Sequence, residues 1–561
     1  MKSTEQALSA RTLLLILTLF SVLWLGTIGY RKLIMPDEGR YAEIPREMVA
    51  SGDWLTPRLD GLKYFEKPAL QYWATAAAFT LFGEHQWTAR LWSALTGLLG
   101  ILATWFTARR LWGGGAALGG AGVLAGSLLY GLIGHVNTLD MGVSFFLSAA
   151  VFAFVLAQHD DASPRENRNY MLAAWLAAAL AMLSKGLIGL VLPGTALVAY
   201  SLWQRDFSSW RRLHLVPGLA LFAVVAVPWF VAVSLANPGF AQFFFIHEHF
   251  QRFLTKEAGR YQPIWYFLPI LVVGMAPWLV ALFSAPWSAL RREPLQRFQP
   301  LRFLLVWIVV VFCFFSVSDS KLASYILPLF PALVLLLGAA AAALPPAAML
   351  RRFHLIIVTA AIGAIVAVAS MFLLHTKAPE QALQHALIGL TLTMLLIAGA
   401  TLFGARALHH GRRRTAMHVL ALAAIVGWQG MLISSQSYVD MASAAPVARI
   451  IKPRLRPGTE VFTVRTYLGG LPFYLGRLVT VVDQHRDDLD PGLASRPTGY
   501  IADVATFEQR WRMSNDAIAV APANLLVQFR VQGLPFYELG RHDQNVIIGR
   551  RMPAHPASTA H

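Results

Sequence analysis

The chain has almost no cysteine and little charge. Its one cysteine among 561 residues, Cys313, lies in the apolar run FLLVWIVVVFCFF. Neither a disulfide within one chain nor a cysteine-based zinc site is therefore possible. Charged residues make up only 14% of the chain and hydrophobic residues 56%, with a mean hydropathy of +0.52. A soluble multidomain protein is excluded by this composition, which predicts a polytopic α-helical membrane protein.

The chain is strongly basic, with a formal net charge of +17. Its basic residues stand in short clusters between apolar runs and do not follow one face, so they are no footprint for nucleic acid. Such clusters are typical of the cytoplasmic loops of membrane proteins. The sequence therefore predicts membrane lipids, and no nucleic acid, as partners.

Apolar runs of spanning length predict about thirteen transmembrane helices. The first, 12–30, has no small-residue cleavage site and is predicted to be an uncleaved span. The expected spans are 11–30, 87–109, 115–134, 139–157, 170–184, 187–203, 215–234, 264–286, 302–317, 323–343, 354–374, 383–404 and 416–435.

Arginines predict the orientation of these spans. With the N-terminus in the cytoplasm, every inward loop contains arginine: Arg109 and Arg110; Arg165 and Arg168; Arg205, Arg211 and Arg212; Arg291, Arg292 and Arg297; Arg351 and Arg352; Arg406, Arg412, Arg413 and Arg414. The remaining loops then face outward, to the periplasm of a Gram-negative bacterium. Arg31 and Lys32 are the exception, which a loop with functional cations would explain.

Two further helices and one soluble domain are expected. Residues 41–50 are amphipathic and 68–82 are too short to span, so both are predicted to lie along the membrane. From residue 438 onward, the runs EVFTVR, RLVTVVD, GYIADV and NVIIGR predict a small α/β domain. The predicted domains are 1–437, with outward loops at 31–86 and 235–263, and 438–561, which ends in a disordered tail.

The first outward loop is where chemistry is expected. It carries seven of the thirty acidic residues of the chain: Asp37, Glu38, Glu43, Glu47, Asp53, Asp60 and Glu66. Other ionisable residues also fall at the outward ends of spans: Asp140, Lys185, His247, His249, Arg252, Asp319 and Lys321, with Tyr325 close by. Ionisable groups at membrane depth are costly. Their position on one side predicts a single cavity at the outer leaflet.

Structural explanations remain open for several of these residues. Asp37, Glu38 and Asp140 could cap helices, and Glu66 with Lys67 could be an interfacial ion pair. His247 and His249 are two residues apart, which is not a helical ligand spacing. Lys185 is harder to explain in this way, because turns usually use Gly, Asn or Ser.

The segment 36–68, PDEGRYAEIPREMVASGDWLTPRLDGLKYFEKP, together with Asp140, SKG at 184–186 and HFQRF at 249–253, resembles the bacterial aminoarabinose transferases. These proteins move 4-amino-4-deoxy-L-arabinose from undecaprenyl phosphate to lipid A phosphates, and are related to the protein O-mannosyltransferases of the GT-C class. The resemblance runs through the membrane region and includes an outward C-terminal domain. It implies a glycosyltransferase of the bacterial inner membrane that gives resistance to polymyxin and other cationic antimicrobial peptides.

The resemblance also implies residue roles. It assigns Asp37 and Asp140 as catalytic carboxylates, with Glu38 beside the first. Cations are needed at the leaving phosphate of an undecaprenyl-phosphate-linked sugar. The residues implied there are Lys67, Arg252, Lys185, Tyr325, Tyr41 and Tyr64. Glu66 and His247 are the implied place for a divalent metal such as zinc, although two ligands do not close a site.

The chemistry of the acceptor limits what Asp37 has to do. A hydroxyl acceptor would need a general base, whereas the phosphate of lipid A is already ionised. Asp37 is therefore expected to orient a substrate or to stabilise positive charge on the sugar, and the reaction is expected to invert the anomeric centre. A protein O-mannosyltransferase-like enzyme and a lipid transporter stay as alternatives. A transporter would show midplane charges and paired interrupted spans.

Overall fold

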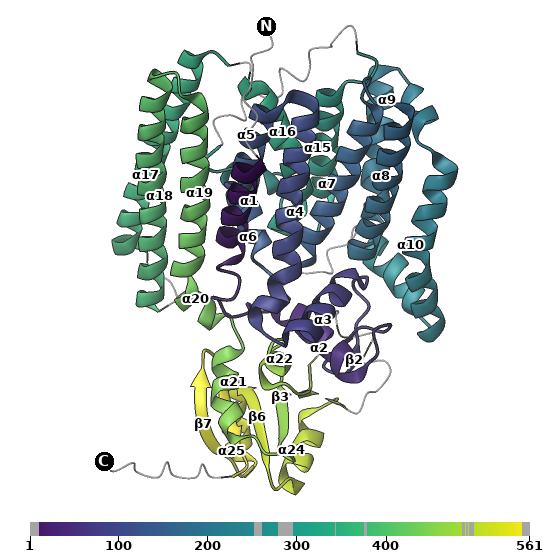
Figure 1. Ribbon diagram of the computed structural model, residues 1–561. Coiled ribbons are helices and arrows are strands. Elements are labelled where there is room, and N and C mark those ends of the chain that lie inside the picture. Colours follow the sequence, from purple (N-terminus) through teal and green to yellow (C-terminus); the bar gives the residue numbers. More distant parts are fainter. Residues whose placement is uncertain are drawn as a thin grey trace. The chain divides into compact units, whose positions relative to one another are not determined.

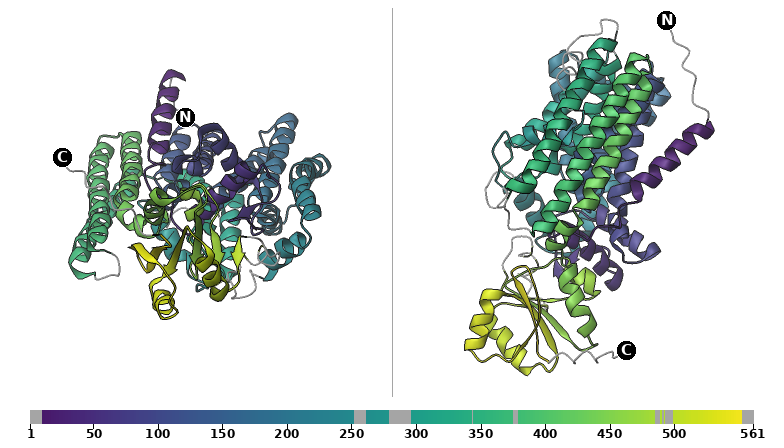
Figure 2. Two further views of the ribbon diagram at one scale, coloured as in Figure 1. Left: turned by 90° about the horizontal axis from the view of Figure 1, so that it is seen from below. Right: turned by 90° about the vertical axis from the view of Figure 1, so that its left-hand side faces the viewer.

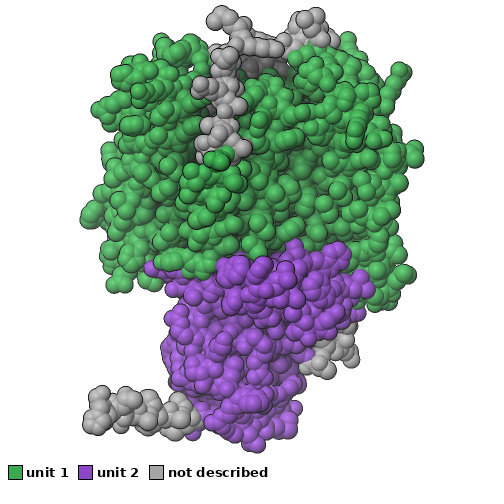
Figure 3. Space-filling model, in the orientation of Figure 1, with its two compact units in different colours: residues 1–30, 67–71, 90–435 green, residues 31–66, 72–89, 436–561 purple. Residues whose placement is uncertain are grey.

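The computed structural model describes residues 10–251, 261–278, 296–342, 344–374, 379–484, 489, 492 and 499–551. The chain divides into two compact units, which Figure 3 colours separately. Unit 1 comprises residues 1–30, 67–71 and 90–435, and unit 2 comprises residues 31–66, 72–89 and 436–561. The first loop therefore shares a unit with the C-terminal segment, whereas the predicted domain 1–437 groups it with the spans.

Unit 1 is a bundle of helices (Figure 1). Its elements are α1 (Ala10–Leu25), α4 (Gln86–Trp112), α5 (Gly114–Ala125), α6 (Leu128–Gly134), α7 (Leu139–Gln158), α8 (Pro164–Lys185), α9 (Ile188–Gln204), η1 (Ser208–Arg212), α10 (Leu215–Ala236), the π-helix η2 (Gln242–Gln251), α12 (Phe267–Gly274), α15 (Pro300–Val317), η3 (Ala323–Leu329), α16 (Phe330–Ala342), α17 (Pro346–Leu373), α18 (Glu380–His409) and α19 (Arg413–Ser434). Figure 2 shows α17, α18 and α19 running side by side.

Many of these helices can cross a membrane. Within the described ranges, 8 spans are long and apolar enough, and the bent pair α5 and α6 would make a ninth. The predicted number of thirteen stays a prediction. Helix α3 (Leu70–Phe82) has 13 residues, which is below the spanning length, and its predicted place along the membrane also stays a prediction.

Helix α7 connects two chemically different ends of unit 1. This helix is apolar nearly all round, and 89% of its most apolar 18-residue stretch is buried. Such burial is expected for a helix inside a bundle. Asp140 lies in its first turn and Gln158 is its last residue. With 20 residues at 1.5 Å rise each, the two ends are about 30 Å apart.

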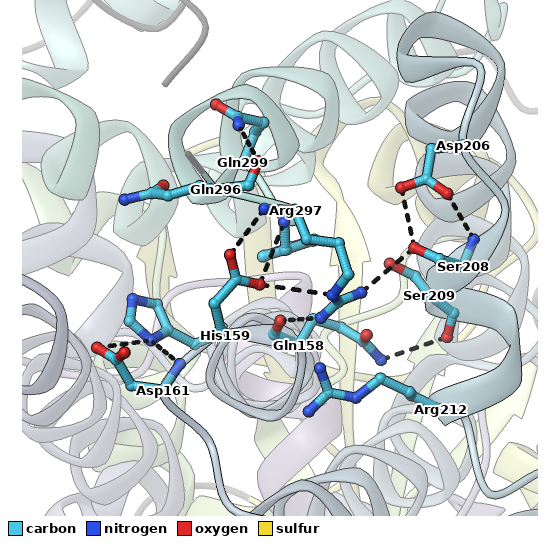
Figure 4. A network of polar contacts seen from close by, with 12 residues as sticks. Gln158, His159, Asp161, Asp206, Ser208, Ser209, Arg212, Gln296, Arg297 and Gln299 are labelled. Atoms are coloured by element: carbon cyan, nitrogen blue, oxygen red, sulfur yellow. Dashed lines mark hydrogen bonds and ion pairs between the residues drawn. The ribbon is translucent and has the colours of Figure 1, made fainter. Parts of the chain in front are cut away.

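Polar contacts join several connections at the Gln158 end of α7 (Figure 4). The main-chain N–H of Arg297 donates to Asp160, and its guanidinium donates to the carbonyl oxygen of Gln158, each over 2.7 Å. Arg212 donates to the carbonyl oxygen of Ala157 over 3.1 Å. Arg110 pairs with Glu166 near the start of α8. Arginines from three predicted inward loops therefore lie at the same end of the bundle.

Unit 2 combines the first loop with a mixed α/β sheet. Its elements are α2 (Asp37–Ser51), the hairpin β1 (Arg58–Leu59) and β2 (Leu62–Lys63), most of α3, α20 (Gln436–Met441), α21 (Ala445–Ile451), η4 (Lys452–Arg454), β3 (Glu460–Val464), α22 (Leu471–Leu475), β4 (Thr480–Val482), β5 (Tyr500–Ile501), α24 (Val504–Met513), β6 (Ala517–Pro522), α25 (Ala523–Val531), β7 (Tyr537–His542) and β8 (Asn545–Gly549). The larger sheet has the strand order β5-β4-β3-β6-β8-β7.

Alternating side chains bury both faces of this sheet. Phe462 and Ala519 belong to the core beneath α24 and α25, whereas their neighbours Val461 and Ile518 belong to the core beneath α21 and α22. Strands β3, β4, β5 and β6 are parallel, and β8 runs antiparallel to β6 and β7. Burial on both faces is typical of parallel strands.

The four predicted β-runs form β3, β4, β5 and β8. The sequence analysis missed β6, whose run AIAVAP lacks polar alternation because both faces are buried. It also missed the mostly polar strand β7, YELGRH. Residues 41–50 form part of α2, and their predicted place along the membrane stays a prediction. Glu43, Arg46 and Glu47 on the polar face of this helix are buried.

Candidate active site

Helix α2 begins at Asp37, directly after Pro36. The Asp37 carboxylate accepts a hydrogen bond from the guanidinium of Arg40, three residues later, which is a spacing that places both side chains on one helix face. The side chain of Arg40 is 4% exposed and that of Asp37 is 31% exposed. A buried cation thus orients a carboxylate that remains accessible.

Arg40 is the centre of a cluster in unit 2. Its guanidinium carbon lies 5.0 Å from the ring centroid of Tyr41 and 5.9 Å from that of Tyr64. The Tyr64 hydroxyl donates to Glu66 over 2.7 Å, and Arg40 Nη1 lies 3.8 Å from the same carboxylate. Burial alone would lower the pKa of Arg40, but the surrounding tyrosines and carboxylates outweigh it and raise that pKa well above its usual value.

Glu38 faces a different way from Asp37. Its carboxylate accepts the main-chain N–H of Ile34 over 3.0 Å, and its own N–H donates to the carbonyl oxygen of Ile34 over 3.0 Å. The residue is 1% exposed. These bonds close the turn that leads into α2 and give Glu38 a structural role, while its predicted catalytic role stays a prediction.

Asp140, Lys185 and Tyr325 meet in unit 1. Asp140 forms an ion pair with Lys185, and the Lys185 ammonium lies 4.1 Å from the ring centroid of Tyr325. The Ser324 hydroxyl donates to the second carboxylate oxygen of Asp140 over 2.6 Å. The start of α7, the end of α8 and the start of η3 therefore supply one cluster, in which three predicted site residues are in contact.

Lys67 and His247 lie near Glu248, also in unit 1. Lys67 pairs with Glu248 over 3.0 Å, and the Glu248 side chain is 5% exposed. The ring of His247 stacks on Phe243 at 5.0 Å, and its Nδ1 lies 3.9 Å from Glu248. Both His247 and Glu248 belong to the π-helix η2, a rare element often found at functional sites. The predicted phosphate ligand Arg252 lies outside the described residues.

The predicted metal site has little support from its donors. No group of three or more His, Cys, Asp or Glu that could hold a metal ion occurs in the part of the chain that the structure describes. Glu66 accepts a hydrogen bond from Tyr64 and faces Arg40, so its charge is already balanced. Because zinc takes at least three protein ligands, Glu66 and His247 alone would not close a site, and the metal stays a prediction.

Two family descriptions match different parts of the chain. Residues 447–550 match the aminoarabinose transferase C-terminal domain. Residues 9–244 match the dolichyl-phosphate-mannose-protein mannosyltransferases. The first match covers all six strands of the larger sheet of unit 2, and the second covers the helices that carry Asp140 and Lys185.

Two relatives align with more than half of this chain. The undecaprenyl phosphate-alpha-4-amino-4-deoxy-L-arabinose arabinosyl transferase of Aeromonas salmonicida is 38% identical over 57% of this chain and 58% of that protein. The protein of the same name from Edwardsiella ictaluri is 32% identical over 76% of this chain and 79% of that protein. The chain belongs to the aminoarabinose transferase family.

Solved structures agree with this family. ArnT from Cupriavidus metallidurans, crystallised bound to undecaprenyl phosphate, is 34% identical and superposes with a TM-score of 0.91 over 97% of this chain and 99% of that chain. The archaeal oligosaccharyltransferase AglB from Archaeoglobus fulgidus, 13% identical with a TM-score of 0.50, shares the fold alone. The chain is thus a multi-pass membrane protein with the fold of the aminoarabinose transferases and a small α/β region near its C-terminus.

Three polar residues of this aminoarabinose transferase family member were missed by sequence analysis. Arg40 stands in the loop motif, three residues after Asp37, and that spacing is a signal that could have found it. Glu248 lies between His247 and His249, and the sequence analysis considered only these two histidines as candidate ligands. Ser324 carried no signal, because only the fold brings η3 to the first turn of α7.

Proposed function

We propose that this protein transfers 4-amino-4-deoxy-L-arabinose from undecaprenyl phosphate to a phosphate group of lipid A. The observation that carries this proposal is the match to ArnT bound to undecaprenyl phosphate, which extends over 97% of this chain. The sugar is supported by the names of the relatives. An added amino sugar would partly neutralise the lipid A phosphates, and so weaken the binding of polymyxin and other cationic peptides.

The proposed reaction is a single displacement. An oxygen of the acceptor phosphate donates an electron pair to the anomeric carbon, and the bond from that carbon to the donor phosphate oxygen breaks. Undecaprenyl phosphate leaves with the bonding electrons, so no oxidant or further reactant is needed. One in-line step inverts the anomeric centre.

Cations would balance the charge that develops on the leaving phosphate. Lys67 and Lys185 are assigned to this task together with Arg252. The ammonium of Lys185 is held by Asp140 and faces Tyr325, which supports a fixed position and not a mobile surface charge. Tyr41 and Tyr64 are assigned to the donor through the family resemblance, and both flank Arg40.

The two carboxylates would have different tasks. Because the acceptor phosphate is already anionic, Asp37 is assigned to orienting a substrate or stabilising positive charge on the sugar, and Asp140 to fixing the lysine. The reaction is assigned to the periplasmic face of the inner membrane. The support for this side is that Arg110, Arg212 and Arg297 lie at the Gln158 end of α7, opposite Asp140, and arginine-rich ends favour the cytoplasm.

A divalent metal such as zinc at Glu66 and His247 stays a prediction. Elemental analysis of the purified protein tests it, with His247→Ala as the comparison. Zinc bound by the wild type at one equivalent and lost from the variant would support the metal, whereas equal content in both would contradict it.

A second candidate is transfer of mannose or another sugar to protein, favoured by the match of residues 9–244 to the protein mannosyltransferases. The match of residues 447–550 favours aminoarabinose. Mass spectrometry of lipid A from cells with and without the gene separates the two. A mass increment of one aminopentose that depends on the gene supports the proposal. Unmodified lipid A alongside gene-dependent hexose on proteins would replace it.

A further inference from the structure

Two chain segments more than 350 residues apart in sequence share unit 2: residues 31–66 and residues 436–561. Just before α2, main-chain N–H groups of the first loop donate hydrogen bonds to residues of the C-terminal segment. The N–H of Met35 donates to the carbonyl oxygen of Ala442 over 2.8 Å. The N–H of Leu33 donates to the Tyr474 hydroxyl over 2.7 Å. The C-terminal segment thus fixes the approach to Asp37.

A backbone contact then fixes the first turn of α2. Gly39, two residues after Asp37, packs directly on Gly470. A Cβ atom built on Gly39 would lie 2.6 Å from the Cα of Gly470, and one built on Gly470 would lie 3.2 Å from the Cα of Gly39. Real side chains do not tolerate the shorter distance. Glycine at position 39 is therefore required for this approach, and a side chain at position 470 would push the backbone of Gly39 away by a few tenths of an ångström.

Buried carboxylates hold the far side of the same loop. Glu47 of α2 accepts the N–H groups of Asp60 and Gly61 over 2.5 and 2.9 Å. Asp60 in turn accepts the N–H of Val479 over 2.9 Å, one residue before β4. The loop is therefore tied to the C-terminal segment on both sides of α2, and each tie uses backbone groups whose positions are fixed.

We infer that the C-terminal α/β segment is a positioning scaffold for Asp37, acting through the Gly39–Gly470 contact. This inference rests on the proposed function. Asp37 and Gly39 belong to one helical turn, so a displacement at Gly470 moves the carboxylate. Misplacement of a reacting group by about 1 Å can lower the rate roughly 100-fold.

The test compares two glycine substitutions in the same unit. Gly470→Ala adds a methyl group to the contact, whereas Gly458→Ala adds one where no atom lies within 4 Å. With purified full-length protein, we expect kcat to fall at least tenfold in Gly470→Ala and to match wild type in Gly458→Ala. Affinity for undecaprenyl phosphate is expected to stay unchanged in both. Equal turnover of the two variants would overturn the inference.

A double variant separates positioning from general destabilisation. If Gly470 acts through Asp37, the pair Gly470→Ala with Asp37→Asn should be no slower than Asp37→Asn alone, because the two changes remove the same contribution. Independent, multiplying losses would contradict the inference. Gly39→Ala tests the same contact from α2, a helix that alanine itself favours, with the shorter approach of 2.6 Å, and the same outcomes apply to it. A wild-type protein that transfers no aminoarabinose would overturn the proposed function instead.

Discussion

The Arg40 side chain is only 4% exposed, and a guanidinium N–H of this residue donates a hydrogen bond to the accessible carboxylate of Asp37, one helical turn earlier. Arg40→Gln removes the charge that orients Asp37, so turnover should fall by roughly tenfold to more than a hundredfold, as for the loss of a charge-assisted hydrogen bond of about 1.5 to 3 kcal/mol. Arg40→Lys should recover little, because lysine lacks the planar fork. The measurement is kcat of purified protein. Near wild-type kcat in Arg40→Gln would refute the orienting role.

Asp37 is predicted to contribute more to catalysis than Glu38. Asp37→Asn keeps the size but removes the charge, so turnover should fall steeply while donor binding survives. Glu38→Gln should mainly lower stability, because Glu38 bonds to Ile34. Wild-type turnover should follow ionisation of the acceptor phosphate, with a second pKa of about 6. Normal turnover in Asp37→Asn, beside an inactive Asp140→Asn, would transfer the main role to Asp140.

Ser324 is predicted to position Asp140. Ser324→Ala removes the 2.6 Å hydrogen bond, and kcat should fall about three- to tenfold, as for the loss of roughly 1 kcal/mol. Ser324→Thr should retain most of the rate because it keeps the hydroxyl. Ser316→Ala is the matched control, since its buried hydroxyl has no hydrogen-bond partner among the described residues. Equal rates for Ser324→Ala and Ser316→Ala would argue against the prediction.

Lys67 is predicted to bind the donor phosphate and to release Glu248, with which it forms an ion pair in this structure. Lys67→Ala should weaken undecaprenyl phosphate binding by roughly tenfold to more than a hundredfold, whereas Lys63→Ala in the same loop should not. Glu248→Gln should strengthen binding, because Glu248 competes with the phosphate for the ammonium. Affinities of the purified variants test this. Unchanged affinity in Lys67→Ala would show that the cation is only an interfacial anchor.

Asp60 makes the stability of unit 2 depend on pH. Burial raises the pKa of Asp60 well above its usual value, and the charge of Glu47 raises it further, although the bond from Val479 opposes them. The folded state then holds a proton that the unfolded chain releases near pH 4, so this contribution to stability is lost as pH rises through the folded pKa.

Asp60→Asn should remove that dependence. Asparagine keeps an acceptor for Val479 and tolerates the left-handed φ of 58°. The Tm of the variant minus that of wild type should therefore increase between about pH 5 and pH 8. A difference that stays constant across this range would contradict the raised pKa of Asp60.

The sequence was most informative where local pattern decides structure. The length of apolar runs predicted the helices, and the residues of the loop motif led to the candidate site around Asp37. Contacts between distant segments could not be predicted in this way. The polar face of α2 is buried because Arg46 pairs with Glu43 within the helix, and Glu47 binds the N–H groups of the following hairpin. The hydrophobic periodicity of residues 41–50 cannot predict that this polar face is buried.

The central claim is transfer of the amino sugar from lipid to lipid, and reconstitution tests it most directly. Purified protein in liposomes would be given undecaprenyl phosphate-linked 4-amino-4-deoxy-L-arabinose and lipid A, with Asp140→Asn as the control, and the products analysed by mass spectrometry. The account predicts lipid A carrying one aminopentose, together with free undecaprenyl phosphate, for wild type and neither product for the variant. Unmodified lipid A with an intact donor, from a wild-type protein shown to be folded, would contradict it.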